Sequence, residues 1–162
     1  MNRFISFDDV SCFNLLVRLA QVMEWISNKQ QVATDESYSD PTNLSNKIQR
    51  HQAFEAELAA NKRRLDAVVA EGNELSSGGH YATKDINARL AALEQAWQNL
   101  VESSQDKSVK LAQAYQALQF NRQCDDLERW LDDVEGQLAS EDHGRDIATV
   151  QALLKRHQVR AT

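Results

Sequence analysis

The sequence predicts an all-α protein, a three-helix bundle whose last helix runs on into a second, partial bundle. Three observations support this prediction. The 162 residues include only 5 glycines and 1 proline, well below the usual share of about 12%, which excludes sandwiches, barrels and other folds with many tight turns. Apolar residues recur at intervals of three and four, as on the buried face of a helix. Residues 83–138 contain one glycine and no proline, which favours one unusually long helix.

The first helix is expected to end before the acidic segment 35–40. Its apolar stripe consists of Leu15, Leu19, Val22, Ile26 and Val32. The dipeptide Asp40-Pro41 follows and favours a new helix, because an N-cap aspartate accepts hydrogen bonds from free amides and proline fits the first helical turn. We therefore predict Asp40 as the N-cap of the second helix.

The second helix is expected to end at Gly78-Gly79, a pair typical of a helix stop followed by a turn. Its stripe consists of Leu44, Ile48, His51, Leu58, Leu65, Val68 and Leu75. A single stripe is buried only when helices pack lengthwise against one another. Three helices joined by two short loops can close such a bundle.

The third helix is expected to span residues 83–138, interrupted in its apolar pattern only by Ser104 and Ser108. About 55 residues at 1.5 Å each would make a rod on the order of 80 Å long. That length suits an array of bundles, in which one helix ends the first bundle and begins the next. The stripe consists of Ile86, Leu90, Leu93, Trp97, Leu100, Leu111, Tyr115 and Leu118, then Phe120, Cys124, Leu127, Leu131, Val134 and Leu138.

An internal repeat supports the array. Residues 33–52 align with residues 139–158 at an offset of 106, so that Asp40 corresponds to Asp146, which we predict to be a second helix N-cap. A repeat of this period with three helices indicates successive bundles. We expect a non-matching segment at 1–12, a complete repeat at 13–117 and a partial second repeat at 118–162.

Three tryptophans lie on or beside the stripes and are expected to anchor the core, where truncation to alanine would cost about 3–5 kcal/mol. The predicted structural core consists of Trp25, Trp97, Trp130, Ile26, Leu44, Ile48, Leu90, Leu93 and Leu131. The partial repeat lacks a third helix, so its stripe should stay uncovered. We expect the chain beyond about residue 125 to fray or to self-associate with a second chain.

Composition and motifs exclude several functions. The net charge of −6 disfavours nucleic-acid binding, which needs a basic face. The four histidines are spread too widely for a zinc site, and residues 35–46 fail the calcium-loop pattern. No phosphate-binding glycine loop or catalytic serine turn occurs, and Cys124 lies on an apolar stripe. We therefore expect no enzyme activity, catalytic residue, metal or cofactor. The apolar run 13–22 is too short for membrane insertion.

Several segments resemble one known family. They are Trp25-Ile26, DESYSDPTNL (35–44), HQAFEAELAANK (51–62), LAALEQAWQNL (90–100) and QFNRQCDDLERWL (119–131). Together they are similar to the spectrin-repeat family and, within it, to the alpha-spectrin group. One departure is that Leu15 occupies the position before Trp25 where the family usually carries Phe-Asn-Arg, as at 120–122. The chain looks like a segment of a longer protein.

The resemblance implies a structural role. It implies an elastic spacer and protein-interaction surface in the cytoplasmic actin cytoskeleton, at the inner face of the plasma membrane. The implied partners are a beta-spectrin-like rod and other cytoskeletal proteins, with actin reached only through modules that this segment does not contain. No nucleic-acid partner is implied.

Two other functions are consistent with long amphipathic helices. A dimeric coiled-coil adaptor would pair its seams between chains, which leaves the turns at 35–41 and 76–81 unexplained. A protein that lies on a lipid surface needs Lys and Arg flanking the apolar face, and the acidic balance speaks against it.

Overall fold

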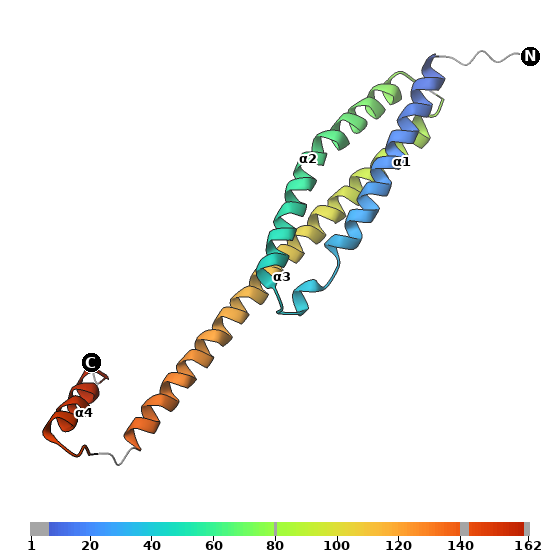
Figure 1. Ribbon diagram of the computed structural model, residues 1–162. Coiled ribbons are helices and arrows are strands. Elements are labelled where there is room, and N and C mark those ends of the chain that lie inside the picture. Colours follow the sequence, from blue (N-terminus) through green and yellow to red (C-terminus); the bar gives the residue numbers. More distant parts are fainter. Residues whose placement is uncertain (1–6, 80, 140–142, 161–162) are drawn as a thin grey trace, which may run out of the picture. The chain divides into compact units, whose positions relative to one another are not determined.

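A computed structural model of the chain describes residues 7–79, 81–139 and 143–160 (Figure 1). These residues form helices and loops without any strand, so the predicted all-α class is confirmed. The helices are α1 (Phe7–Ala33), η1 (a short 3-10 helix, Ser37–Ser39), α2 (Leu44–Ser77), α3 (Thr83–Leu138) and α4 (Ile147–Arg160). In the part of the chain that the structure describes, no helix has the length and apolarity needed to cross a membrane.

The chain divides into two compact units, Met1–Leu118 and Gln119–Thr162. The boundary lies inside α3, which is one helix of 56 residues. The first unit therefore contains α1, α2 and the N-terminal part of α3. The second contains the rest of α3 and α4.

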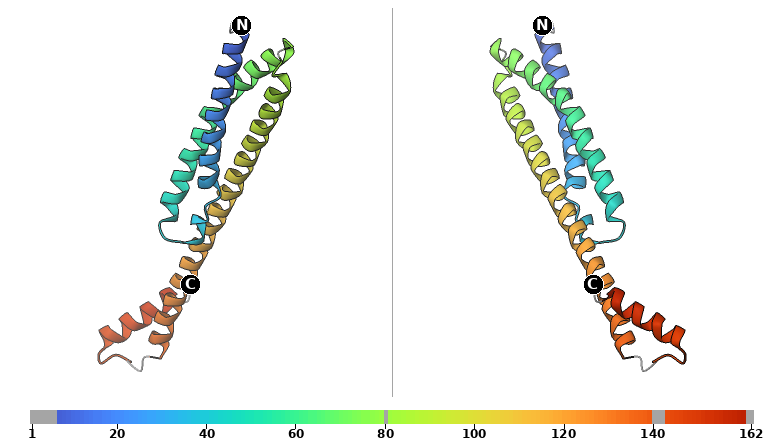
Figure 2. Two further views of the ribbon diagram at one scale, coloured as in Figure 1. Left: turned by 90° about the vertical axis from the view of Figure 1, so that its right-hand side faces the viewer. Right: turned by 90° about the vertical axis from the view of Figure 1, so that its left-hand side faces the viewer.

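Unit 1 is a three-helix bundle in which α1, α2 and α3 run lengthwise beside one another (Figure 2). Its core lies along the common axis, and the largest fully buried side chains there include Leu15, Leu93 and Leu100. Burial of each such leucine stabilises a fold by about 1.5–3 kcal/mol. The spacing of three and four residues places these side chains on one face of each helix, which is why the helices close around a single core.

The connection between α1 and α2 differs from the prediction. Helix α2 begins at Leu44, and its N-cap residue is Asn43 in a left-handed conformation with φ of 55° and no side-chain capping bond. Asp40 is not that cap, because its carboxylate accepts hydrogen bonds from the amide of Thr42 at 2.9 Å and from Lys47 at 2.9 Å. Asparagine tolerates the left-handed region better than most residues, so the chain turns there and the helix starts three residues late.

Gly72 lets α2 approach α3 closely. A Cβ atom at this position would lie 2.8 Å from Cδ1 and 3.2 Å from Cγ of the buried Leu90. Gly72→Ala should lower the unfolding free energy of unit 1 by about 1–2 kcal/mol, because overpacking outweighs the helix propensity of alanine. Denaturant unfolding measures the loss.

Two variants control this prediction. Gly136→Ala changes a glycine of α3 with nothing within 4 Å of its Cβ position, so it should be neutral or slightly stabilising. Combining Gly72→Ala with Leu90→Ala should cost less than the sum of the single changes, since the contact is then removed. Additive losses would show that Gly72 has no packing role.

Unit 2 leaves its apolar residues uncovered in the part that the structure describes. Phe120, Leu127 and Leu138 of α3 and Ile147 and Leu154 of α4 are all exposed. Trp130 is 52% exposed and Leu131 is 45% exposed, so their assignment to the core does not hold in this structure. The physical reason is that the described residues of this unit supply two helices, and two helices cannot enclose a stripe on every side.

Candidate functional site: the aromatic pair and the loop clamp

Two tryptophans meet in the middle of unit 1. The rings of Trp25 in α1 and Trp97 in α3 stack with centroids 6.3 Å apart and planes inclined by 18°. Trp97 is only 9% exposed, whereas Trp25 is half-buried and has the ammonium of Lys29 5.8 Å from its ring centroid. Such aromatic pairs add about 0.5–1.5 kcal/mol beyond their buried area.

The structure brings the other predicted core residues of unit 1 into the same bundle. Ile48 is half-buried. The remaining four are buried: Ile26, Leu44, Leu90 and Leu93. Among the tryptophans, only Trp130 lies outside this assembly, in unit 2.

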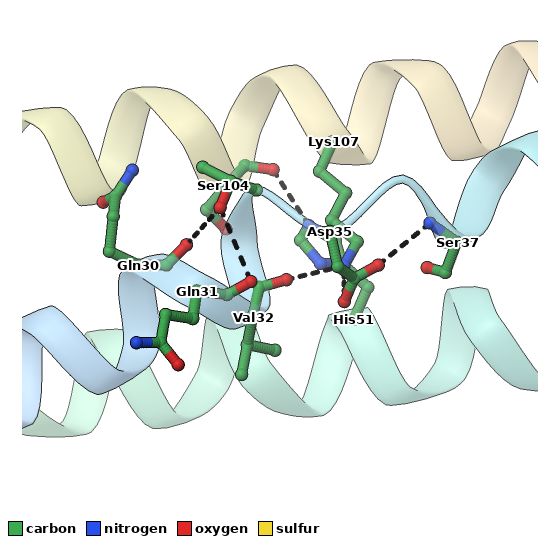
Figure 3. Close-up of polar contacts among 9 residues, drawn as sticks. Gln30, Gln31, Val32, Asp35, Ser37, His51, Ser104 and Lys107 are labelled. Atoms are coloured by element: carbon green, nitrogen blue, oxygen red, sulfur yellow. Dashed lines mark hydrogen bonds and ion pairs between the residues drawn. The ribbon is translucent and has the colours of Figure 1, made fainter.

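A polar layer replaces the apolar core at the end of the bundle near the α1–α2 loop (Figure 3). The Nε2 atom of the buried His51 lies 2.9 Å from the carbonyl oxygen of Ser104, and its ring stacks on Phe54. The side-chain amide of Gln30 donates to the Ser103 hydroxyl at 2.8 Å. These bonds join all three helices of unit 1 through polar groups.

Lys107 is the most unusual member of this layer, because it is a charged residue with only 6% exposure. Its ammonium donates to the carbonyl oxygen of Val32 at 2.7 Å and lies 2.7 Å from a carboxylate oxygen of Asp35. The Val32 carbonyl belongs to the last turn of α1, where carbonyls have no helical partner and attract cations. Lys107 therefore ties the end of α1 and the following loop to α3.

The apolar spacing of the sequence did not predict Lys107 as a core residue. The available signal was its position: it lies three residues after Ser104 and four before Leu111, on the same stripe. A lysine reaches such a position because its long apolar stem packs while its ammonium finds oxygen partners.

Two more lysines hold the same loop. The Lys47 ammonium donates to the backbone carbonyl of Asp40 at 2.8 Å and to its carboxylate at 2.9 Å. The Lys110 ammonium lies 5.2 Å from the ring centroid of Tyr38. We call these three contacts the loop clamp, which consists of Asp35 with Lys107, Tyr38 with Lys110 and Asp40 with Lys47.

The clamp shifts the acidity of its members. Partial burial raises the pKa of Asp35, but hydrogen bonds from Lys107 and Ser37 outweigh it and lower the pKa from 3.8 to about 2. Hydrogen bonds from Lys47 and then Thr42 hold the pKa of Asp40 far below its usual range. The Asp106 carboxylate and then the Tyr38 hydroxyl raise the pKa of Lys110.

Acid should weaken unit 1 through Asp35. Its folded-state pKa of about 2 lies below the ordinary value of 3.8, so its ionised form contributes stability that is present above pH 3.8 and lost as pH falls toward 2. Asp35→Asn should flatten this slope of unfolding free energy against pH between those values. A slope identical to that of the unsubstituted protein would contradict the role of Asp35.

Helix α4 begins with a reciprocal cap. The Asp146 carboxylate accepts the amide of Thr149 at 2.8 Å, and the Thr149 hydroxyl accepts the amide of Asp146 at 3.2 Å. The Thr149 amide and then the Thr149 hydroxyl lower the pKa of Asp146. This geometry is that of an N-cap in a capping-box arrangement.

Removing this cap should loosen α4. Asp146→Ala leaves the Thr149 amide without its acceptor, so amide exchange in the first turn of α4 should accelerate. Asp146→Asn keeps an acceptor and should leave exchange nearly unchanged. Equal exchange rates in the alanine and asparagine variants would contradict a capping role.

The contacts of this site hold helices and loops to one another. The described residues contain no group of three or more His, Cys, Asp or Glu side chains that could hold a metal ion. Cys12 is buried and Cys124 is half-buried, and both are free thiols. The geometry consists of stacked rings, ion pairs and capped helices, which determine how firmly the loop and helices stay together.

Comparison with known proteins gives consistent matches. A family model described as spectrin repeat matches residues 12–113 and 115–160. The erythrocytic spectrin alpha chain 1 of Mus musculus is 41% identical over 133 residues, which cover 82% of this chain and 6% of that protein. The spectrin beta chain of Drosophila melanogaster is 32% identical over 152 residues, covering 94% of this chain and 7% of that protein.

A third relative gives the same picture. The erythrocytic spectrin beta chain of Mus musculus is 32% identical over 149 residues, covering 92% of this chain and 7% of that protein. The chain thus spans 6% to 7% of the length of these relatives.

Proposed function

This chain belongs to the spectrin-repeat family, and on that basis we propose that it is a structural segment of a spectrin-like scaffold between actin and the membrane. Within the scaffold it acts as an elastic spacer and as a surface for protein partners. Residues 13–117 form a complete repeat in this proposal, and residues 118–162 belong to a second one. The scaffold lies in the cytoplasm at the inner face of the plasma membrane.

The observation that carries the proposal is the continuity of α3. This helix runs without interruption from Thr83 to Leu138, and the boundary between the two compact units falls inside it. At 1.5 Å per residue its 56 residues extend over roughly 84 Å. A helix shared in this way transmits bending and tension from one unit to the next.

Elasticity follows from the bundle energetics. Pulling on the segment must either bend α3 or open a bundle, and opening exposes buried side chains such as Leu15, Leu93 and Leu100. The cost of exposing apolar surface is about 25 cal/mol per Å², which gives a restoring free energy as long as the helices can close again. Lys107 adds to this resistance, because its ammonium joins the Val32 carbonyl at the end of α1 to α3.

The partners in this proposal are proteins. A beta-spectrin-like rod would pair with the segment side by side, and other cytoskeletal proteins would bind its polar surface. Actin would be reached through other parts of a longer molecule. Support comes from the similarity to both alpha and beta spectrin chains.

A proline at the junction tests mechanical coupling. Gln116 is an exposed position of α3 close to the unit boundary, and proline there removes a helical hydrogen bond at a cost of about 3 kcal/mol. In single-molecule stretching between the chain termini, Gln116→Pro should separate the unfolding of the two units, whereas Gln116→Ala should unfold like the unsubstituted chain. Identical force curves for the proline and alanine variants would contradict the spacer proposal.

The dimeric coiled-coil adaptor is the alternative function. It requires apolar seams that pair between chains, while α1, α2 and α3 bury their stripes within one chain in unit 1. Sedimentation equilibrium distinguishes the two. The spacer proposal predicts a unit 1 core that stays folded at the monomer mass, and the adaptor predicts that dilution to monomer unfolds the whole chain.

A further inference from the structure

The buried apolar side chains of unit 1 fall into a large group and a small one. The large group is one continuous cluster, which we call the main core. Its buried members begin at Phe54 on α2 and end at Leu100 on α3, and on α1 they extend from Cys12 to Ala33. Leu44 and Leu111 are just as well buried, with 1% and 2% exposure, but they do not belong to this cluster.

The small group lies at the end of the bundle near the α1–α2 loop. Helix α2 begins there with Leu44. On α3, Leu111 follows directly after Lys110, whose ammonium lies 5.2 Å from the ring centroid of Tyr38 in that loop. We call this part of unit 1 the loop end, which consists of the last turn of α1, the loop, the first two turns of α2 and the part of α3 beside them.

The polar layer lies between the main core and the loop end (Figure 3). His51 occupies this level on α2, and Ser104 and Lys107 occupy it on α3. Gln30 of α1 reaches the same level, since its side-chain amide donates to the Ser103 hydroxyl. Within the described residues, the buried side-chain oxygens of Gln30 and Ser104 have no hydrogen-bond partner. The three helices therefore meet here through groups that water can hydrate.

Opening the loop end costs less than opening the main core. It exposes Leu44 and Leu111, and the burial of one leucine shifts an equilibrium by about tenfold to hundredfold. Opening the main core exposes all of its members, among them Leu93, Trp97 and Leu100. The polar layer adds little to the cost of opening, because water replaces its hydrogen bonds and also reaches the two side-chain oxygens that have none.

Lys107 makes the opening of the loop end one event rather than gradual fraying. Its ammonium binds the Val32 carbonyl in the last turn of α1 and the Asp35 carboxylate in the loop, each at 2.7 Å. The Lys107 side chain is only 7% exposed, so it holds both segments to α3 from inside the bundle. Neither segment can leave α3 until the ammonium releases both oxygens and is hydrated.

We propose that unit 1 opens in two steps, with the polar layer as the boundary between them and Lys107 as the latch of the first. In the first step the loop end separates from α3 and water enters the polar layer, while the main core around Trp97 stays closed. In the second step the main core opens. This inference rests on the packing of unit 1 and does not depend on the proposed function.

Two buried leucines of α3 provide matched reporters in the full chain. Leu100→Cys places a thiol in the main core, and Leu111→Cys places one in the loop end, with Cys12 and Cys124 replaced by alanine in both. Labelling by a thiol reagent follows the population of the opened state when closing is faster than labelling. The thiol at position 111 should react at least about a hundredfold faster than the thiol at position 100. Low denaturant should accelerate labelling at position 111 only weakly, because the first step exposes little surface.

Two further substitutions assign contacts to the two steps. Lys107→Met should speed labelling about tenfold at both positions, because the contacts of the latch are broken in either opened state. Ile86→Val makes a small change in the main core, where Ile86 is fully buried, and should speed labelling about fivefold at position 100. It should leave labelling at position 111 unchanged, since the main core stays closed in the first step.

Equal labelling rates at the two positions, with the same steep dependence on denaturant, would show a single step and overturn the proposal. An effect of Ile86→Val at position 111 as large as at position 100 would also overturn it. Amide exchange in the chain with both leucines retained keeps the test decisive if a cysteine variant does not fold. Ile86→Val should then speed exchange at residues 61–68 of α2 but not at residues 48–51, and equal acceleration at both would contradict two steps.

Discussion

Trp97→Ala should lower the unfolding free energy of unit 1 by about 3–5 kcal/mol, a larger loss than most single substitutions cause. Trp97 is 9% exposed and stacks on Trp25 across the interface of α1 and α3. Its removal therefore leaves a cavity and also ends the aromatic contact. Thermal unfolding should report a fall of the unit 1 transition by many degrees.

Trp130→Ala is the matched control. Trp130 is 52% exposed in unit 2, and substitutions at such positions usually change stability by no more than about 0.5 kcal/mol. The two variants remove the same side chain from different surroundings. Equal losses in both would contradict the assignment of the core to unit 1.

Lys107→Met should destabilise unit 1 by about 1–3 kcal/mol, because the Val32 carbonyl would lose a part-buried hydrogen bond from a charged donor. Methionine keeps the apolar stem and its packing, so the loss isolates the ammonium. In this variant water can hydrate the half-exposed carboxylate of Asp35. The pKa of Asp35 should rise toward 3.8, since Lys107 is one cause of its lowering. Denaturant unfolding and carboxyl titration by NMR measure the two effects.

Lys110→Met provides the comparison on the same helix. Lys110 is more exposed and pairs with Asp106 along the surface of α3, so this substitution should leave stability unchanged. A Lys107 variant as stable as the Lys110 variant would show that the buried ammonium makes no net contribution to the bundle.

The helical pattern of this chain could be predicted from the sequence because the spacing of apolar residues reports directly on burial. Leu93 and Leu100 lie on the predicted stripe of α3 and are fully buried. Trp130 and Leu131 follow the same spacing but stay exposed. The spacing of apolar residues shows which face of a helix is apolar. It does not show whether another helix packs against that face and buries it.

Asp40 and Asp146 lie at equivalent positions of the internal repeat, and they show what a local sequence motif cannot predict. Asp40 has Lys47 seven residues later, and the ammonium of Lys47 binds its carboxylate. The position seven residues after Asp146 is Leu153, so the Asp146 carboxylate is left to accept the Thr149 amide. An aspartate thus caps the helix at one position and forms an ion pair at the other. The difference arises because the partners available to the carboxylate differ between the two positions.

The contacts of the loop clamp could not be predicted from the sequence, for a related reason. Lys107 and Asp35 form an ion pair although they are 72 residues apart. No sequence pattern predicts a contact between residues at that separation. The pairing depends on the depth at which α3 meets the end of α1, which only the assembled bundle defines. A lysine on an apolar stripe is the signal to follow in similar chains.

The sharing of α3 as one helix between two repeats is tested most directly by a spin-label distance. Glu102 and Glu128 are exposed positions of α3 on either side of the unit boundary. With both changed to cysteine and labelled, and with Cys12 and Cys124 replaced by alanine, pulsed electron resonance should find one narrow distance near 39 Å, from roughly 26 residues at 1.5 Å each. A broad distribution centred well below that value would show a broken or flexible junction and would contradict a shared helix.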